Sequence, residues 1–306
     1  MIEKFETTTK EKPKRPENYF EELNNLLKQI SEEINNNLKE QQEDDTKLVN
    51  DDCSINMGDF TKVHQAEKID RDEKYVKEQI KRFAPDPKNK SVQTFYKTTD
   101  ENKIIKAWQE NKKRSDGSLT EMAITSILYK FLKDKFVVVR SSKFDDYHNG
   151  VDNLIVDKET GEVICAFDAI RIGDSDNDKI RFRDKIMRIS DKISEGGINV
   201  DYGLTYTKDN EKNEMKLTKT ALKNVPIFCF GLFKEELSKL LSEMNYDINT
   251  KPNEAELNIF KKLMKNLDGQ KNFQLKNNAL KPDMREKMEK LSGFIDKMRL
   301  AGLESK

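Results

Sequence analysis

Residues 150–172, GVDNLIVDKETGEVICAFDAIRI, predict two strands joined by a short charged turn, and this stretch decides the fold. Val151 to Asp157 and Val163 to Ile170 are rich in β-branched and apolar residues, which favour strands. Lys158 to Glu162 supplies a turn that contains a glycine. The stretch therefore predicts a β-hairpin.

The register of this hairpin decides where its acidic residues lie. If all five turn residues lie outside the ladder, Asp152 falls opposite Asp168 on one face. Opposed residues have Cβ atoms about 5 Å apart, and like charges so placed are destabilising unless a proton or cation lies between them. A four-residue turn would send the two acids to opposite faces, so both registers remain open. The five-residue turn predicts the pairs Asp157–Val163, Val156–Ile164, Leu154–Ala166 and Asp152–Asp168.

The composition describes a chain with much solvated surface. Of its 306 residues, 35% are hydrophobic and 37% are charged, and Lys plus Arg equals Asp plus Glu at 56 each. The formal net charge of zero gives no overall positive field to attract an anionic polymer. Any contact with nucleic acid must therefore come from a local basic patch.

The cysteines and the longest apolar run indicate a cytoplasmic protein. Cys53, Cys165 and Cys229 are widely spaced and odd in number, which predicts buried free thiols in a reducing compartment. The longest apolar run, Val225 to Phe233, is far shorter than the roughly 20 residues that cross a bilayer. We therefore expect no membrane association.

The pattern along the chain divides it into four segments. Residues 1–17 are polar and predict a disordered tail, and residues 18–115 predict a weakly hydrophobic helical extension that includes a polar linker at 41–52. Residues 116–246 predict the α/β core. Residues 252–306 predict a second helical extension, whose alternating acids and bases indicate solvated helix faces.

A helix predicted between Phe20 and Leu38 carries a narrow apolar seam, because apolar residues recur there at spacings of three and four. The pattern lasts for less than three heptads. Packing within the chain is the simpler interpretation. A short coiled coil, used for self-association or for a protein partner, is the alternative.

The core segment alternates helices with strands. The expected order is a helix from Ser118 to about Asp134, a strand at 136–139, a polar loop at 141–149, the hairpin, a helix ending at Gly196 and Gly197, strands at 198–206 and 225–232, and a closing helix from Lys234 to Met244. Residues 208–216 between the last two strands are a charged excursion. This order predicts a three-layer α/β/α domain with a mixed sheet.

Three acids of this core carry a resemblance to a known family. With Glu121 on the first helix, Asp152 at the start of the second strand and Asp168 late in the third, residues 118–244 resemble the PD-(D/E)XK nuclease superfamily. The resemblance implies that Asp152 and Asp168 bind Mg²⁺ or Mn²⁺ and that Glu121 is an outer ligand or holds a water. It also implies hydrolysis of DNA or RNA phosphodiester bonds, in which the cation lowers the pKa of the attacking water and neutralises charge on the phosphate.

The chain departs from the family pattern at Ile170, where the pattern has a lysine two residues after the second acid. That lysine orients and activates the water, so its loss costs rate or the whole activity. Some members of the superfamily take this cation from elsewhere, and Lys179 and Lys185 on the following helix are the candidates here. Arg171 is nearer in sequence, but strand alternation points it to the opposite face from Asp168.

A purely structural role accounts for Glu121 but not for Asp168. Glu121 ends a capping box that begins at Ser118, and this explains it without any catalytic role. Asp168 has apolar residues on both sides, where an unpaired carboxylate is costly to desolvate. It therefore needs a metal, a base or a proton.

Residues near the hairpin are candidates for contact with nucleic acid. His148 precedes Asp152 and could hold a scissile phosphate, although a histidine in a loop is more often simply exposed. Arg181 and Arg188 could contact a phosphate backbone, but acids alternate with them, as on a self-neutralised helix surface.

Three functions remain open from the sequence. The first is a metal-dependent nuclease-like domain, and the second is an inactive member of the same fold that binds nucleic acid or serves in assembly. The third is an unrelated α/β interaction module whose acids are incidental.

Overall fold

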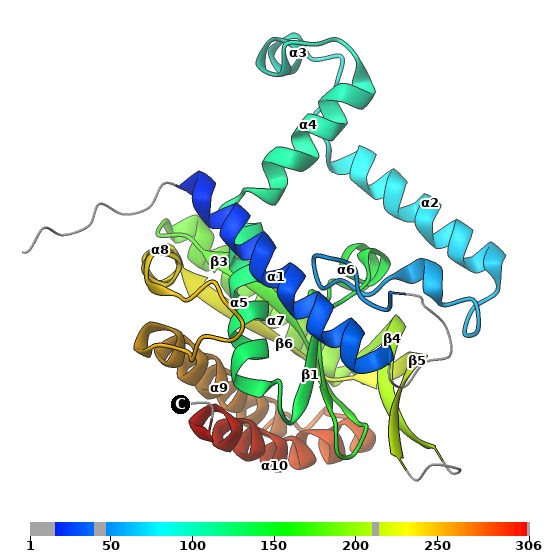
Figure 1. Cartoon of the computed structure of the whole chain (residues 1–306), viewed down its shortest axis with the longest axis vertical. Coiled ribbons are helices and arrows are strands. Elements are labelled where there is room, and N and C mark those ends of the chain that lie inside the picture. Colours follow the sequence, from blue (N-terminus) through cyan, green and yellow to red (C-terminus); the bar gives the residue numbers. More distant parts are fainter. Residues whose placement is uncertain (1–15, 40–46, 210–213, 305–306) are drawn as a thin grey trace, which may run out of the picture.

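The structure is a computed structural model that describes residues 16–39, 47–209 and 214–304. Its centre is a four-stranded mixed sheet of order β1-β2-β3-β6 (Figure 1). Strands β1, β2 and β3 pair antiparallel, and β3 pairs parallel with β6. The four strands are β1 (Phe136–Arg140), β2 (Asn153–Asp157), β3 (Val163–Ile172) and β6 (Ile227–Phe233). The predicted α/β class with a mixed sheet is confirmed.

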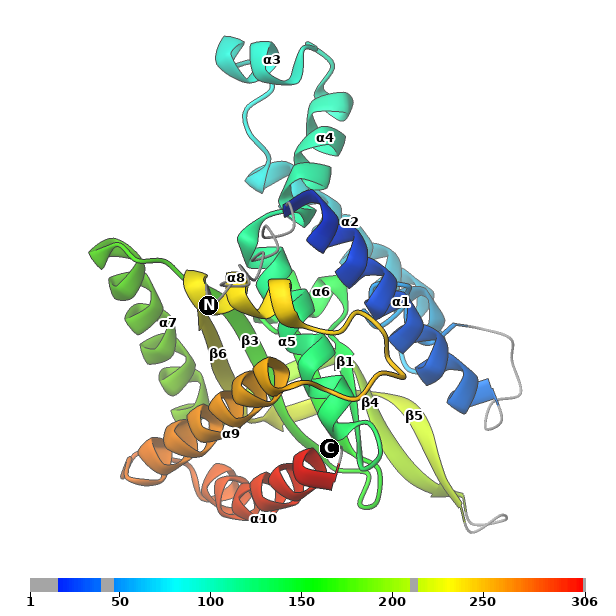
Figure 2. The same cartoon turned by 60° about the vertical axis from the view of Figure 1, so that its left-hand side comes forward.

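Helices cover both faces of this sheet. On one face lies α5 (Asp116–Leu132), which packs across β1 and β3, and around it lie α1, α8, α9 and α10. On the other face lies α7 (Asp176–Ser194), which connects β3 to the second half of the core (Figure 2). The helices around α5 are α1 (Pro16–Lys39), α8 (Lys234–Glu243), α9 (Glu254–Leu275) and α10 (Pro282–Glu304). These are the three expected layers.

A two-stranded ribbon, β4 (Ile198–Asp209) with β5 (Glu214–Val225), stands apart from the main sheet. The predicted charged excursion at 208–216 is wrong at both ends, because β4 runs to Asp209 and β5 begins at Glu214, and strand β5 itself was not predicted. Val225 ends β5, and Pro226 separates it from β6. The ribbon contacts β2 and α6 (Lys143–Asn149), so it braces the hairpin that carries the acids.

The N-terminal helix belongs to the main hydrophobic core. Leu23, Leu27 and Ile30 of α1 have no exposed surface and pack against α5. The simpler interpretation, packing within the chain, therefore holds for the apolar seam between Phe20 and Ile34, which α5 covers. The side chain of Leu38 and residues 1–15 of the predicted tail lie outside what the structure describes. The last two residues of that tail, 16 and 17, already belong to α1.

Segments predicted to be solvated are also buried. Leu48 and Val49 lie in the predicted polar linker, yet both are buried, and residues 40–46 of that linker lie outside the described residues. In the C-terminal helices, Leu263, Met288 and Leu291 are buried against the body. Each helix has a solvated face, as the charge pattern indicates, but its apolar face completes the core.

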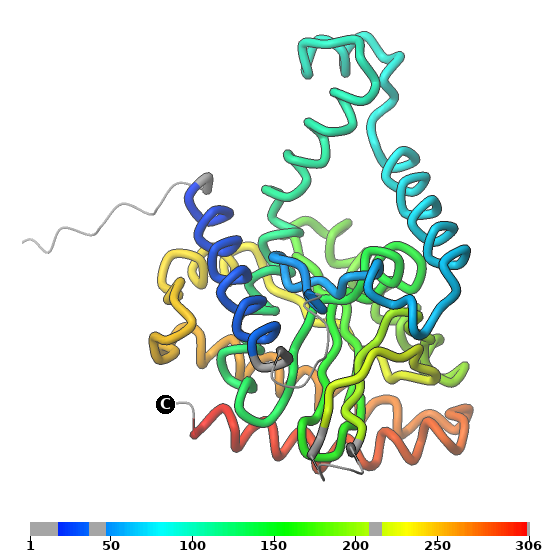
Figure 3. Tube along the Cα trace, turned by 45° about the vertical axis from the view of Figure 1, so that its right-hand side comes forward, coloured from blue at the N-terminus to red at the C-terminus, as the bar shows by residue number. Residues whose placement is uncertain are grey.

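Residues 66–113 form a helical arm that rises from the body, as Figures 1 and 3 show. The arm consists of α2 (Ala66–Phe83), α3 (Lys90–Tyr96) and α4 (Glu101–Lys113). These three helices agree with the prediction of a helical extension over residues 18–115. Among the described residues, no helix is both long and apolar enough to cross a membrane.

The hairpin register agrees with the prediction at its open end. Leu154 pairs with Ala166 as expected, but a bulge between Ile155 and Val156 pairs Val156 with Val163. The prediction for the turn end, Val156 with Ile164, is wrong for this reason. Because the bulge lies near the turn, it leaves the register at the open end unchanged.

A buried ion pair joins the central helix to the C-terminal helices. Lys130 of α5 donates a hydrogen bond from Nζ to Glu256 Oε1 of α9 at 2.8 Å, and side-chain exposure is 1% for Lys130 and 0% for Glu256. Glu256 also accepts a hydrogen bond from the Asn253 backbone at the start of α9. The C-terminal helices are therefore bound to the core by charge as well as by apolar packing.

We expect Lys130→Met to lower the free energy of unfolding by about 3–5 kcal/mol, because it leaves the Glu256 carboxylate buried without its partner. Lys133→Met is the matched control, since Lys133 lies one turn on and pairs with Glu33 at 3.4 Å in a partly exposed position. We expect that control to cost less than about 1 kcal/mol. Urea denaturation measures both, and equal losses would contradict the assignment.

Candidate functional site

The hairpin brings two aspartates to the same end of the sheet. Asn153 pairs with Phe167, so the next positions along the ladder are Asp152 and Asp168. The Asp152 backbone N–H donates to Phe167 O at 3.0 Å, and Ala169 N–H donates to Asp152 Oδ2 at 2.6 Å. The Asp152 carboxylate is thus fixed against the strand that carries Asp168.

The site concentrates negative charge. Burial raises the pKa of Asp152 well above its usual value, and the neighbouring charges of Glu121, Asp168 and Asp146 add to that rise. The Ala169 N–H opposes it by stabilising the carboxylate. The pKa of Glu121 is also raised, mainly by burial. These acids therefore favour a proton or a cation between them.

Lys185 supplies one such cation to Asp168. Its Nζ donates to Asp168 Oδ1 at 2.6 Å, from the helix that covers this face of the sheet. Burial acts to lower the pKa of Lys185, but the charge and hydrogen bond of Asp168 outweigh it and the pKa is raised. Asp168 is therefore paired with an ammonium group that comes from α7.

A second lysine lies on the same side of α7. Lys192, seven residues after Lys185, donates from Nζ to Asn149 O at 2.8 Å at the end of α6. Burial lowers the pKa of Lys192, while Asp168 raises it and the positive charges of Lys185 and Arg188 lower it. Lys192 therefore lies within electrostatic range of the acids and ties α6 to α7.

Glu121 is held by an arginine and does not cap its helix. The N-cap of α5 is Ser115, whose Oγ accepts from Ser118 N–H, so the capping box predicted from Ser118 to Glu121 is wrong. Glu121 Oε2 instead accepts from Arg140 Nη2 at 2.9 Å. The helix begins one turn earlier than expected, which frees the Glu121 side chain to turn toward the end of β1.

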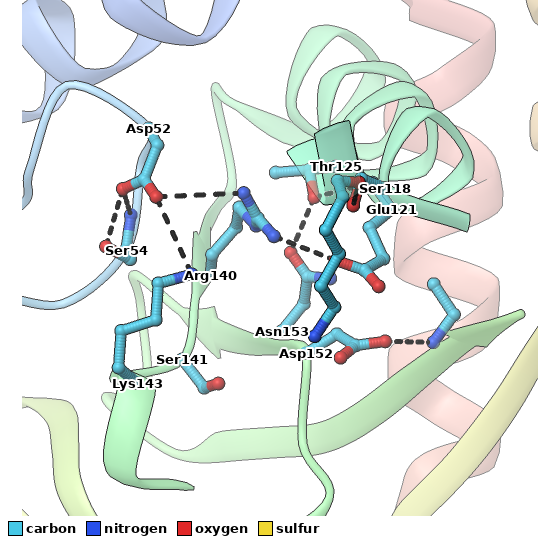
Figure 4. A network of polar contacts seen from close by, with 12 residues as sticks. Asp52, Ser54, Ser118, Glu121, Thr125, Arg140, Ser141, Lys143, Asp152 and Asn153 are labelled. Atoms are coloured by element: carbon cyan, nitrogen blue, oxygen red, sulfur yellow. Dashed lines mark hydrogen bonds and ion pairs between the residues drawn. The ribbon is translucent and has the colours of Figure 1, made fainter. Parts of the chain in front are cut away.

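Arg140 joins two acids from distant parts of the chain, as Figure 4 shows. Its Nη1 lies 3.9 Å from Asp52 Oδ2, while its Nη2 bonds Glu121. Asp52 is held in turn by the backbone N–H and hydroxyl of Ser54 at 3.1 and 2.5 Å. The attraction of Glu121, Asp52 and Asp152 outweighs the effect of burial and raises the pKa of Arg140.

The structure does not bring the remaining predicted residues to the acids. Lys179 is largely exposed and lies 3.6 Å from Asp176, and Arg181 is exposed on the first half of α7. Arg188 is exposed and donates from Nε to Asp184 O. His148 is exposed on α6, where a loop was predicted, and its ring stacks on Phe144 at 4.9 Å. Arg171 points to the opposite face, as predicted, and lies 3.1 Å from Asp116.

The sequence analysis missed Arg140, Asp52 and Lys192. Arg140 gave a weak signal, since it is a charged residue that directly follows the apolar run of β1. Asp52 gave none, because an isolated bridge between Ser54 and Arg140 brings it to the site from far away in sequence. Lys192 lies two helical turns after Lys185, so it shares a helix face with the predicted lysine.

The donor set is compatible with a hard divalent cation. One oxygen each of Asp152 and Asp168 accepts a hydrogen bond, and within the described ranges no hydrogen bond occupies the other two oxygens. Mg²⁺ is often bound through one or two carboxylates together with waters and substrate phosphates. In the part of the chain that the structure describes, no group of three or more His, Cys, Asp and Glu side chains is arranged to hold a metal. Two carboxylates are therefore what the protein offers.

Comparison of the chain with protein-family models, with curated proteins and with solved structures finds no match.

We expect Asp152→Asn to raise the free energy of unfolding by about 1 kcal/mol near pH 7, because it removes a charge that burial and neighbouring acids disfavour. The amide oxygen can still accept from Ala169 N–H. Since the folded-state pKa of Asp152 is raised, the wild type loses stability as pH rises from the unfolded pKa through the folded one. The gain should therefore shrink as pH falls toward the unfolded pKa.

Asp157→Asn, at the other end of β2, is the control for this prediction. Asp157 is fully buried, pairs with Lys297 at 2.5 Å and accepts from the Glu159 and Thr160 N–H groups. Its replacement should destabilise the protein. Thermal unfolding followed by circular dichroism measures both variants. A loss of stability in Asp152→Asn at neutral pH would contradict the electrostatic account.

Proposed function

We propose that this protein is a metal-dependent, nuclease-like hydrolase of DNA or RNA phosphodiester bonds. The observation that carries the proposal is the meeting of Asp152, Asp168 and Lys185 at one end of the sheet, with Lys185 Nζ 2.6 Å from Asp168. Two carboxylates and an ammonium group are the side chains that the resemblance to the PD-(D/E)XK superfamily implies, although the lysine comes from α7 and not from β3.

The acids are suited to hold Mg²⁺ or Mn²⁺. The pKa of Asp152 is raised first by burial and then by the negative charges of Glu121, Asp168 and Asp146, and a divalent cation would neutralise those charges. Such a cation would supply Lewis acidity to the phosphate and lower the pKa of a nearby water. The proposal needs only Asp152 and Asp168 as protein ligands.

The other side chains have roles that follow from their contacts. Lys185 keeps its proton, because its pKa is raised, and so can donate a hydrogen bond to a phosphate oxygen beside Asp168. Glu121 is oriented by Arg140 and can accept a hydrogen bond from a water. Lys192 adds positive charge on the same helix face. The two lysines would stabilise the negative charge that develops on a phosphate, while Glu121 would hold the water.

The alternative function is an inactive member of the same fold that binds nucleic acid or a partner without cleaving it. One observation favours it: the Lys185 ammonium occupies one oxygen of Asp168, and Ile170 fills the position of the family's lysine. In that case the ion pair between Lys185 and Asp168 is structural. Cleavage assays separate the two functions.

We expect the purified chain with Mn²⁺ or Mg²⁺ to cleave labelled DNA or RNA, and Asp168→Asn to lower the rate by roughly 100-fold or more. Lys185→Met should lower it by roughly 10- to 1000-fold, because it removes the donor beside the phosphate. Lys179→Met is the matched control, since Lys179 is on the same helix but exposed, and it should leave the rate unchanged. Gel analysis of end-labelled oligonucleotides measures the rates.

The variants must be shown to fold. The double variant Asp168→Asn/Lys185→Met removes both charges and leaves no unpaired partner, so it should unfold close to the wild-type temperature. Absence of cleavage by the wild type with either cation, or wild-type rates in Asp168→Asn, would rule out the hydrolase and leave the inactive alternative.

A further inference from the structure

The helical arm is basic in a chain that has no net charge. Residues 81–114 contain ten Lys and Arg and four Asp and Glu, a net charge of +6, so the rest of the chain carries the balancing negative charge. All ten basic residues are exposed. Among the described residues, only Lys113 and Arg114 of these ten form an ion pair. Most of the positive charge of the arm is therefore available to a partner.

The arm also exposes aromatic rings. Phe95 at the tip is 69% exposed and packs edge-to-face on Tyr96 at 4.8 Å, and Phe83 at the end of α2 is 59% exposed. Basic residues Lys88, Lys90 and Lys97 surround the tip. Exposed rings among unpaired lysines are unfavourable in water but suit a polyanion with flat bases, because bases stack on the rings and lysines neutralise phosphates.

The base of the arm is fixed to strand β4 of the body. Tyr202 Oη of β4 donates a hydrogen bond to Asp72 Oδ2 of α2 at 3.0 Å. Lys68 Nζ of α2 lies 2.9 Å from Asp201 Oδ1 of β4. Ile69 and Val76 of α2 are buried, whereas residues 81–103 are largely exposed. The arm is thus anchored at one end and exposed at the other (Figure 3).

Aromatic and cationic contacts continue from the arm to the site. Phe83 stacks on Tyr147 of α6 at 6.2 Å, and Lys112 Nζ lies 5.3 Å from the same ring and 5.6 Å from that of Trp108. Helix α6 ends at Gly150, two residues before Asp152. A nucleic-acid strand that followed these contacts would pass from the tip of the arm to Asp152 and Asp168.

We propose that the arm, residues 81–114, binds single-stranded nucleic acid and guides it to the acids at the end of the hairpin. This deepens the proposed function and rests on it only in taking nucleic acid as the substrate. Single strands are favoured over duplex because stacking on Phe95 and Phe83 requires unpaired bases. Helix α4 within this segment has 13 residues and is about 20 Å long at 1.5 Å per residue, enough to contact several nucleotides.

The test is fluorescence anisotropy of a labelled single-stranded oligonucleotide with the full chain, in EDTA so that cleavage plays no part. We expect Lys88→Gln/Lys90→Gln/Lys97→Gln to weaken binding and to reduce the slope of log affinity against log salt by about 2, since each lost phosphate contact removes about 0.7. Phe95→Ala should weaken binding by at least about fivefold. A duplex of the same sequence should bind more weakly than the single strand.

Helix α9 offers matched controls on another side of the body. Lys261, Lys265 and Lys276 are exposed there, and Phe273 is 59% exposed, like Phe83. Lys261→Gln/Lys265→Gln/Lys276→Gln and Phe273→Ala change charge and aromatic surface equally and should leave binding unchanged. Equal losses in arm and control variants, tighter binding of duplex, or wild-type binding by the arm variants would overturn the proposal.

The outcome is separable from that of the hydrolase test. Asp168→Asn should bind the single strand as the wild type does, because its change lies at the acids and not on the arm. Absence of cleavage by the wild type, together with binding that depends on the arm, would overturn the hydrolase and support the arm. Cleavage with binding that does not depend on the arm would do the reverse.

Discussion

The structure depends on one costly arrangement, the placing of two like-charged carboxylates at the open end of the β2–β3 hairpin. The ladder through Asn153 and Phe167 fixes where Asp152 and Asp168 lie, and neither can move away without breaking strand pairing. The cost appears as the raised pKa of Asp152 and is offset in part by the Ala169 N–H and by Lys185. Buried acids with strongly shifted pKa values, at the end of a well-packed sheet, are typical of functional sites.

The topology explains how Asp168 comes to be paired with a lysine. Because β3 and β6 are parallel, the chain must cross over between them, and the first part of that crossover is α7. The helix lies on the face to which Asp168 points, so residues on its inner side meet the acid. Lys185 and Lys192 share that side. The helix that the strand order requires thus supplies the ammonium group that pairs with Asp168.

Local pattern predicted the hairpin, the four strands of the main sheet and the need of the Asp168 carboxylate for a partner, because each depends on residues close together in sequence. It failed where neighbouring residues offered equivalent choices: Ser115 and Ser118 are both good N-caps, and the structure uses Ser115. It also failed for contacts between distant segments. The pairing of Asp52 with Arg140 depends on tertiary packing, which no local period encodes. The bulge at Ile155 was hidden for the same reason.

The average charge of a chain is a poor guide to its partners when the charges are segregated. A net charge of zero argued against a field that attracts polyanions, and for the whole molecule that argument holds. Salt limits electrostatic reach to about 10 Å at ordinary ionic strength, so a partner at the tip of the arm senses chiefly the arm. There the net charge is +6 over 34 residues, and the compensating acids lie elsewhere in the chain. The arm projects away from the body, which keeps those charges apart, and its geometry therefore allows a neutral protein to bind an anion locally.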